Sequence, residues 1–379
     1  MDMNKQAVIS PRESAKRITN LNAAMMGKLE SERTVIQKYS DEWAFAHHAS
    51  MSIYKGKIYA MWSSGRIHED DCGQRVMWSY TDGFSEWKSA MVFSDTEMGV
   101  SSQLVKFAQG FCATEERLYA YYAVAEYRPE LLEGENLRPI KNAVYAFSEP
   151  WLSMKRYCCH LMDDGITWSE PVEVPNGGGN HSAERLPDGR YMTAMGTGVL
   201  YTDEIDAESV PVWQTSDLPE ELVERIRNEG APELCEGSFY KTDDGVLHLM
   251  MRSGSYLLWH SESYDNGTTF KEVYPTQFTD DFAKFQFGRL TDGRYYYVGN
   301  PVPDSRRLPL MLAISEDGYN FDKEYIIRDE LMELRKPGAG KGGHYGYPEC
   351  VIHNGYMYII YTTMKEEVEI TKFSLEQLK

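Results

Sequence analysis

A short turn motif recurs along the chain and constrains its fold more than any other feature. The motif reads approximately S-x-D-x-G-x-T-W/F, and it occurs at residues 162–168, 263–270 and 315–321, with a degenerate copy at 79–87. Its aspartate can accept backbone N–H groups of a tight turn, its glycine permits a positive φ, and its aromatic residue starts the next strand. We therefore expect these aspartates to staple hairpins rather than to act as catalytic acids.

The spacing of the motif indicates a repeated structural unit. Its glycines Gly83, Gly165, Gly267 and Gly318 are separated by 82, 102 and 51 residues. These intervals correspond to about two, two and one units of about 41 to 51 residues, which is the length of a four-stranded propeller blade.

Strand-like runs that follow a turn support the same unit. Six such runs begin at Gly56, Glu116, Asp188, Asp244, Asp292 and Asn354. A further blade can be assembled from the chain ends or lie in the insertion at 203–232, which also carries the helical pattern LPEELVERIRNE. We predict an all-β protein, a single propeller of four-stranded blades, with seven blades favoured and six as the alternative.

Domain boundaries and composition narrow the possibilities further. No Pro/Ser-rich spacer divides the chain, so we expect a charged N-terminal segment at 1–42 and one propeller at 43–379. The net charge of −19 argues against a nucleic-acid partner. The chain shows neither a signal-peptide pattern nor an apolar run of about 18 residues, which predicts a cytoplasmic protein that does not cross a membrane. The six cysteines form no CxxC pair, so we expect no metal and no cofactor. The oligomeric state stays open.

The repeats resemble those of the sialidase-like (Asp-box, or BNR-repeat) superfamily of β-propellers. Within this resemblance, Glu236 and Arg252 lie in a segment similar to the one that carries a catalytic glutamate and a carboxylate-binding arginine. Arg307, with Arg306 as its neighbour, resembles the last arginine of the sialidase arginine triad, and Tyr347 resembles the tyrosine nucleophile. The nearest match to the R-I-P motif of the first arginine is Arg66-Ile67-His68, and the nearest acids to the proton donor are Asp70 and Asp71.

Other segments resemble propeller enzymes that cleave uronate-containing glycans, namely rhamnosyl-glucuronate lyases and rhamnosidases and, more distantly, ulvan lyases. The segments are 45–49, GKIYAMWSSG from Gly56, and 69–75. The resemblance implies that an early histidine is catalytic, and His48 matches it best. Cleavage beside a uronate by β-elimination needs a cation for the carboxylate, a base for the C5 proton and an acid for the leaving oxygen.

A propeller points the inner strand of each blade at one channel, so residues that are distant in sequence can meet there. The predicted catalytic residues are His48, Glu236 and Tyr347, and the predicted substrate-binding residues are Arg252, Arg307, His181, Lys341, His344 and His47. We predict a carbohydrate-active enzyme, either a polysaccharide lyase or a glycoside hydrolase, that cleaves an oligosaccharide or polysaccharide containing an acidic sugar at a uronate. The alternatives are a sialidase-type exo-glycosidase that uses Tyr347 and Glu236, and a propeller that binds sugar or protein without catalysis.

Overall fold

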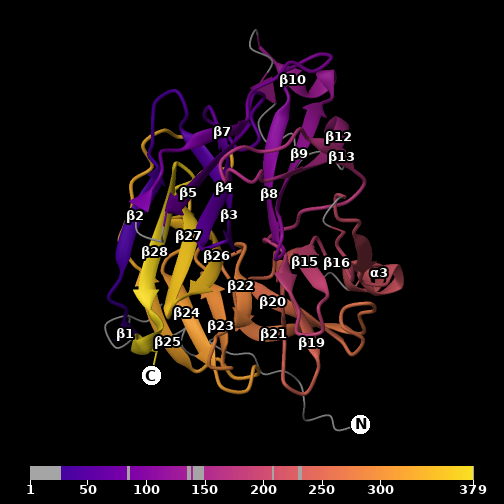
Figure 1. Ribbon diagram of the computed structural model, residues 1–379, viewed down its shortest axis with the longest axis vertical. Helices are drawn as coiled ribbons and strands as arrows, with labels where there is room; N and C mark the ends of the chain where they lie inside the picture. The colour runs from indigo at the N-terminus through magenta and orange to yellow at the C-terminus, as the bar shows by residue number, and fades with distance from the viewer. Residues whose placement is uncertain are drawn as a thin grey trace.

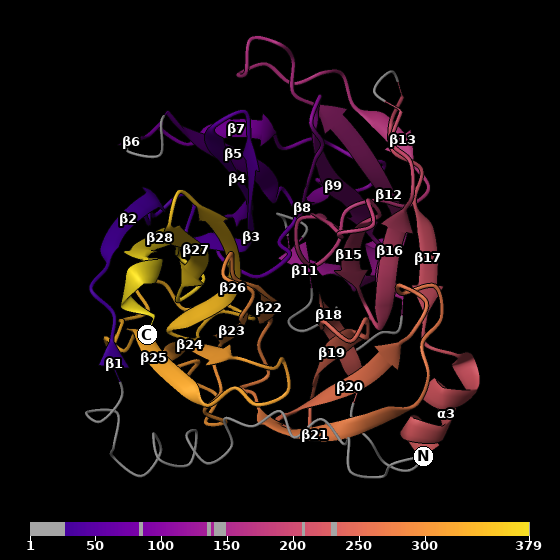
Figure 2. The same cartoon turned by 60° about the horizontal axis from the view of Figure 1, so that its bottom comes forward.

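The chain forms a β-propeller of six four-stranded blades (Figure 2). The computed structural model describes residues 27–82, 86–134, 138–139, 149–206, 209–228 and 233–378. The all-β class and the four-stranded blades are confirmed, whereas the preference for seven blades is wrong. The six strand-like runs of the sequence are the second strands of the six blades.

Each blade runs from an inner strand at the channel to an outer strand at the rim. The first holds β3 (Phe45–Tyr54), β4 (Lys57–Gly65) and β5 (Arg75–Asp82), and its outer strand is in two pieces, β6 (Glu86–Trp87) and β7 (Met91–Ser94), which both pair with β5. The second holds β8 (Val105–Ala113), β9 (Leu118–Tyr127), β12 (Trp151–His160) and β13 (Val172–Val174); the third β14 (Glu184–Arg185), β15 (Tyr191–Met195), β16 (Gly198–Thr202) and β17 (Gln214–Asp217). The fourth holds β18 (Leu234–Lys241), β19 (Leu247–Ser253), β20 (Leu257–Ser263) and β21 (Val273–Thr279); the fifth β22 (Gln286–Arg289), β23 (Tyr295–Gly299), β24 (Leu310–Ser315) and β25 (Lys323–Arg328); the sixth β26 (Tyr345–His353), β27 (Tyr356–Thr363), β28 (Glu367–Ser374) and β2 (Glu32–Gln37).

An N-terminal strand closes the ring. Strand β2 pairs antiparallel with β28 and so supplies the outer strand of the last blade. A short strand β1 (Gly27–Lys28) pairs parallel with β25 of the fifth blade. The predicted boundary at residue 43 is therefore wrong, because residues 27–37 already belong to the propeller sheets. The rest of the predicted N-terminal segment includes residues 1–26, which lie outside the described residues.

Two features of the sequence suggested a seventh blade. The 82 residues between the first two motif glycines span one blade rather than two, because the second blade has long strands and a connection of more than 20 residues between β9 and β12. That connection includes the 3-10 helix η2 (Pro129–Leu131) and the paired strands β10 (Leu132–Glu133) and β11 (Arg138–Pro139). The insertion at 203–232 holds β17 and the predicted helix, α3 (Glu220–Asn228), instead of a blade.

The recurring motif forms the turn between the third and fourth strands of a blade. The Asp317 carboxylate accepts the backbone N–H groups of Tyr319 and Asn320, each at 2.8 Å, and Gly318 has a φ of 79°. The aromatic ring of the motif, Phe321, is fully buried against Tyr240 of the preceding blade. The structural role predicted for these aspartates is confirmed where the turns are described. Part of the degenerate copy, residues 83–85, lies outside the described residues.

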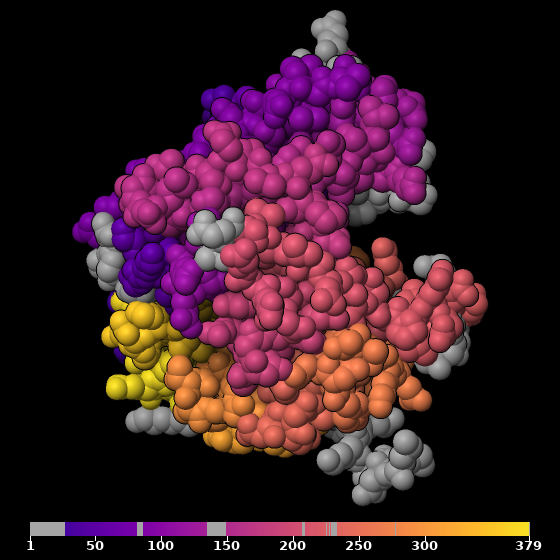
Figure 3. All heavy atoms as spheres, turned by 45° about the vertical axis from the view of Figure 1, so that its right-hand side comes forward, coloured from indigo at the N-terminus to yellow at the C-terminus, as the bar shows by residue number. Residues whose placement is uncertain are grey.

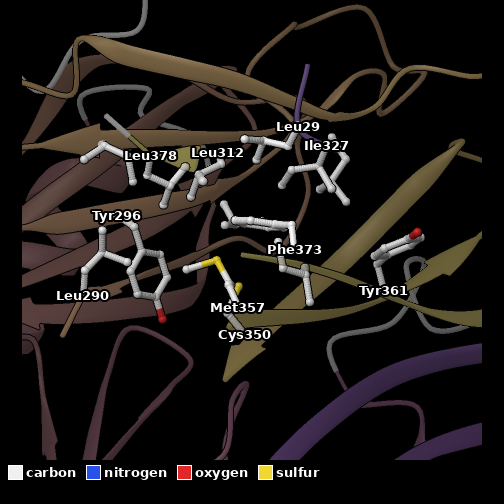
Figure 4. Close-up of a cluster of buried hydrophobic side chains, with 14 of the residues drawn as sticks. Leu29, Leu290, Tyr296, Leu312, Ile327, Cys350, Met357, Tyr361, Phe373 and Leu378 are labelled. Atoms are coloured by element: carbon white, nitrogen blue, oxygen red, sulfur yellow. The ribbon is translucent and has the colours of Figure 1, made fainter. Parts of the chain in front are cut away.

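Apolar clusters fill the space between neighbouring blades. Figure 4 shows the cluster between the fifth and sixth blades, where Leu29 near the N-terminus and Leu378 near the C-terminus pack with residues of both sheets. The C-terminal end is a 3-10 helix η3 (Leu375–Gln377). The second blade extends beyond the ring at the upper end of Figure 1, and its purple and magenta atoms rise above the remaining surface in Figure 3. Among the described residues, no helix has the length and apolar character needed to cross a membrane.

Candidate active site

Four inner strands carry a β-bulge at the same height in the ring. The pairing register shifts between His47 and Ser50 in β3, between Ala108 and Phe111 in β8, between Cys235 and Ser238 in β18, and between Gly346 and Glu349 in β26. In each case two residues face one residue of the second strand, which re-aims their side chains. Three non-glycine bulge residues have a positive φ: His48 (53°), Glu236 (46°) and Tyr347 (61°).

The bulges open onto a pocket of about 310 Å³ at the mouth of the central channel. Each of the six blades contributes at least one residue to its lining. The lining residues are His48, Ser50, Phe107, Ala108, Gln109, Gly110, Ala123, Trp151, Met154, Gly179, Asn180, Glu236, Lys284 and Tyr347. The pocket therefore has a polar side, made by the bulges of three blades and Lys284, and an apolar wall from the extended second blade.

Tyr347, Glu236 and Arg252 form a hydrogen-bonded group beside this pocket. The Tyr347 hydroxyl donates to one carboxylate oxygen of Glu236, and Arg252 Nη1 donates to the other. Arg252 Nη1 also lies 3.0 Å from the Tyr347 hydroxyl. A nucleophile that contacts a base, with a third group orienting the base, is the arrangement expected of covalent catalysis. The three predicted residues are therefore brought together.

Electrostatics assign a protonation state to each member of this group. Burial raises the pKa of Glu236, but Arg252 and the hydrogen bonds from Tyr347 and Arg252 outweigh it, so the net pKa lies below the usual value. Burial, followed by the nearby Glu236 charge, raises the pKa of Tyr347 well above its ordinary value. At neutral pH the group is thus a carboxylate that accepts a hydrogen bond from a neutral phenol.

Cations surround the Tyr347 ring. Besides Arg252, the guanidinium of Arg307 lies 5.5 Å from the ring centroid and the ammonium groups of Lys284 and Lys365 lie 5.7 Å and 5.9 Å from it. Lys365 pairs with Glu69 at 2.5 Å, whereas Arg307 Nη1 has no hydrogen-bond partner. The positive φ of Gly343 (79°) lets the chain pass close to the Arg307 side chain.

The ambiguity between the two adjacent arginines is resolved by their positions. Arg306 is exposed and pairs with Asp304 at 2.6 Å, and Arg307 is the one that turns inward. Arg66, the nearest match to the first arginine of the sialidase triad, is half-buried and lies outside the pocket lining. It pairs with Glu42 at 2.6 Å and stacks on Trp43. Strand β3 contains no arginine, and none of the described arginines lines the pocket.

The two adjacent histidines have different exposure, although the bulge at His48 removes the simple alternation of an extended strand and brings both rings close to Tyr347. His48 lines the pocket and its Nδ1 lies 3.1 Å from the Ser63 hydroxyl. Burial lowers the pKa of His48 to about 4, so its ring is neutral at neutral pH. His47 is fully buried and packs on the Tyr347 ring with centroids 3.9 Å apart. Direct substrate binding by His47 is therefore contradicted, because no part of its surface is accessible.

Lys341 and His344 lie outside the pocket. The Lys341 side chain is fully buried, and its ammonium contacts Glu366 at 2.7 Å and the carbonyl oxygens of Ala44 and Lys336. All three donors are used, so the predicted contact between Lys341 and an anionic sugar is wrong. His344 Nδ1 accepts the backbone N–H of Met332 at 3.0 Å, which indicates that it anchors a loop.

Three residues near the pocket escaped the sequence analysis or were matched only loosely. Lys284 enters the pocket immediately before β22. Glu349 is a buried residue of β26, two positions after Tyr347, and His181 Nδ1 is 3.5 Å from its carboxylate. His181 is also buried and is not part of the pocket lining. Asp70 has a positive φ of 57°. Burial and then the adjacent Glu69 raise its pKa to about 8, so that the carboxyl group is protonated at neutral pH.

Two groups of side chains have spacings that suit a metal ion. They are His47, His48 and Glu69 at the pocket, and His248, His260 and Glu262 in the fourth blade. In the second group His248 and His260 are hydrogen-bonded to each other at 2.9 Å and to Thr242 and Tyr274 at their remaining nitrogens. Both imidazoles therefore already have partners, which favours a structural network.

These features define a class, namely a six-bladed propeller with a pocket built from bulged inner strands. Residues 56–359 match the model of the BNR repeat-like domain, and the chain belongs to this family. The resemblance to the sialidase-like BNR superfamily is thereby confirmed. No curated protein matches the chain in sequence.

Solved structures with the same fold include sialidases. A protein titled sialidase has a TM-score of 0.62 and 14% identity over 92% of this chain, which spans about a third (33%) of that protein's length. The intramolecular trans-sialidase from Ruminococcus gnavus, in complex with oseltamivir carboxylate, has a TM-score of 0.62 and 12% identity over 92% of this chain and 98% of its own. A protein of unknown function from Dyadobacter fermentans has a TM-score of 0.63 and 14% identity, covering 90% of this chain and 98% of its own.

Proposed function

We propose that this protein cleaves a glycosidic bond in a glycan that carries an acidic sugar. The observation that carries the proposal is the Tyr347–Glu236–Arg252 group at the edge of a pocket large enough for a sugar ring. The surrounding cations Arg307, Lys284 and Lys365 favour a carboxylated sugar, since cations near the reacting atoms offset the charge that such a substrate brings.

The reaction that this geometry favours is hydrolysis through Tyr347. In the first step the phenol oxygen bonds to the anomeric carbon, its proton passes to Glu236, and the glycosidic C–O bond breaks. The leaving oxygen takes a proton from Asp70, the acid whose pKa is raised to about 8 by burial and by its neighbour Glu69. In the second step water attacks the anomeric carbon and gives its proton to Asp70, and Tyr347 leaves and recovers its proton from Glu236.

A second candidate reaction is β-elimination at a uronate. It is favoured by the position of His48, whose neutral ring faces the pocket with its centroid 6.0 Å from that of Tyr347. In this reaction His48 takes the C5 proton, the bond from C4 to the glycosidic oxygen breaks as the C4–C5 double bond forms, and an acid protonates the leaving oxygen. The products are an unsaturated uronate and a free hydroxyl, and no water is consumed.

The two reactions are separated by a panel of oligosaccharides that either end in a sialate or a uronate or carry a uronate glycosylated at C4. Hydrolysis adds the mass of water, whereas elimination gives a product with conjugated ultraviolet absorption. For hydrolysis we expect Tyr347→Phe to lower kcat/KM by at least about 10³-fold, because the covalent step is lost. The matched control is Tyr264→Phe, an exposed tyrosine of a box turn. For elimination, His48→Ala should lower kcat/KM by about 10²- to 10⁴-fold.

Two outcomes would refute the proposal. If Tyr347→Phe and His48→Ala both keep full activity on every cleaved glycan, both candidate reactions are excluded. An oligosaccharide that binds tightly and stays intact on long incubation would instead indicate the third class, a propeller that binds sugar without cleaving it.

A further inference from the structure

Of the described residues that line the pocket, Lys284 is the one cation. Arg252 and Arg307 lie around the Tyr347 ring without being part of this lining. Only 3% of the Lys284 side chain is accessible, and the residue comes from the fifth blade, next to the start of β22. A ligand in this pocket therefore meets the Lys284 ammonium before any guanidinium.

The contacts of Lys284 leave donors for a ligand. Its Nζ donates to the backbone carbonyl oxygen of Asn180 at 2.6 Å. Its carboxylate neighbour, Glu349, is 3.9 Å away, which is beyond hydrogen-bond distance. An ammonium has three donors, so a single bond to a carbonyl leaves two of them for an acceptor in the pocket.

Glu349 holds a carboxylate at a fixed position close to this ammonium. One oxygen of Glu349 accepts the backbone N–H of Met51 in the first blade at 3.0 Å and that of Ser182, just before the third blade, at 3.2 Å. The other oxygen faces His181 at 3.5 Å and Lys284. The carboxylate belongs to the sixth blade, so it connects four blades across the channel and has little freedom to move.

The opposite wall of the pocket is apolar. Phe107 and Trp151 contact each other edge to face, with ring centroids 5.7 Å apart, and Met154 lies beside them in the lining. Aromatic rings pack on the apolar face of a sugar, whereas a carboxylate placed against them would lose its hydration without gaining a donor. A sugar ring in this pocket is therefore oriented with its charged substituent toward Lys284.

We propose that Lys284 determines the specificity of the pocket by binding the carboxylate of the acidic sugar, and that Glu349 is the residue that positions it. This inference rests on the proposed function, because it concerns the same pocket and substrate. It assigns the recognition of the carboxylate to a lysine of the fifth blade rather than to the arginines around Tyr347.

The test compares acidic sugars with their methyl esters, which keep the ring and lose the charge. The probes are glucuronate, galacturonate and N-acetylneuraminate, each with its methyl ester, and binding is measured by titration calorimetry. We expect the wild-type protein to bind at least one acid about tenfold or more tightly than its ester, because the desolvated ion pair with Lys284 is lost in the ester. In Lys284→Met this ratio should fall to within about twofold.

Further variants keep the test valid if Lys284→Met folds poorly. The double variant Lys284→Met/Glu349→Gln removes both charges and leaves no unpaired buried carboxylate, and it should show the same loss of selectivity. Glu349→Gln alone should raise KM for the acidic substrate with kcat within about twofold and leave the ester unchanged. Lys106→Met, a buried lysine that pairs with Glu97 outside the pocket lining, is the matched control and should keep the wild-type ratio.

The outcomes separate this inference from the proposed function. An acid-to-ester ratio that persists in Lys284→Met, an equal loss for acid and ester, or a wild-type protein with no preference for acids would overturn the role of Lys284. Selective, Lys284-dependent binding without cleavage of any oligosaccharide would uphold the inference and refute the proposed function. Cleavage of acidic glycans, together with unchanged selectivity in Lys284→Met, would uphold the proposed function and refute the inference.

Discussion

Replacement of Lys341 by methionine tests whether the glycine-rich segment at 338–344 is structural. The Lys341 and Glu366 side chains are both fully buried and lie 2.7 Å apart. Removing one partner of a buried ion pair costs about 3 to 5 kcal/mol, because the other charge stays buried without compensation. Glu366 would still accept the backbone N–H groups of Arg335 and Lys336. We therefore expect Lys341→Met to lower the free energy of unfolding by an amount near the lower end of this range, about 3 kcal/mol.

This loss translates into a measurable change in melting temperature. The entropy of unfolding is about 2.1 cal/mol/K per residue, or about 0.8 kcal/mol/K for 379 residues. A loss of about 3 kcal/mol then lowers Tm by about 4 °C, which calorimetry or a dye-based melt resolves. The double variant Lys341→Met/Glu366→Gln should lose less than the single variant, because the buried charge is removed together with its partner.

Activity measured well below Tm completes this test. Since Lys341 uses its three donors on protein acceptors, kcat/KM of Lys341→Met should stay within about twofold of the wild type. A variant with unchanged Tm and weakened binding of acidic sugars would refute the reasoning and restore Lys341 as a ligand contact.

Three further predictions follow from the geometry. Asp317→Ala should lower stability by about 1 to 2 kcal/mol in denaturant unfolding, because two backbone N–H groups of a box turn lose their acceptor; an unchanged midpoint would contradict the stapling role. Asp70 is a protonated acid below its pKa of about 8, so kcat/KM should fall as the pH rises through 8, and Asp70→Asn should abolish this alkaline limb. Burial lowers the pKa of His248 to about 4, so the stability due to its neutral ring is present above about pH 6.5 and is lost as the pH falls toward 4. In denaturant unfolding, His248→Asn should reduce the pH dependence of the free energy of unfolding on the acid side by up to about 1.4 kcal/mol per pH unit, and an unchanged slope would exclude this group as its cause.

The blade repeat can be recognised in the sequence because four of the six blades use the same few residue types in one turn. An aspartate, a glycine and an aromatic residue mark the hairpin between the third and fourth strands, and the apolar second strand recurs in all six blades. The number of blades was harder to predict from the sequence. The third blade has no motif because a long insertion separates β16 from β17, and the sixth needs none because its fourth strand, β2, comes from the N-terminus.

A residue of the site could be predicted from the sequence where a motif accompanied it. Glu236, Arg252 and Tyr347 are brought together as predicted, and His48 lines the same pocket. Lys341 was misassigned because a lysine between glycines has the same sequence signature whether it is buried or exposed. Lys284 and Glu349 carry no motif. Their proximity depends on how the fifth and sixth blades meet at the channel, which is a property of ring closure that no local pattern contains.

The repeated bulge explains how one scaffold can place unlike chemical groups in the same pocket. A regular strand would alternate its side chains between the two faces of a blade, and both faces are packed against neighbouring blades. The bulge breaks this alternation at one height, and it turns His48, Glu236 and Tyr347 toward the axis. A left-handed backbone at a non-glycine residue costs on the order of 1 kcal/mol, and it persists because the strand continues in register on both sides. Substitution at these positions therefore changes the chemistry of the pocket without disturbing the apolar clusters that hold the blades together.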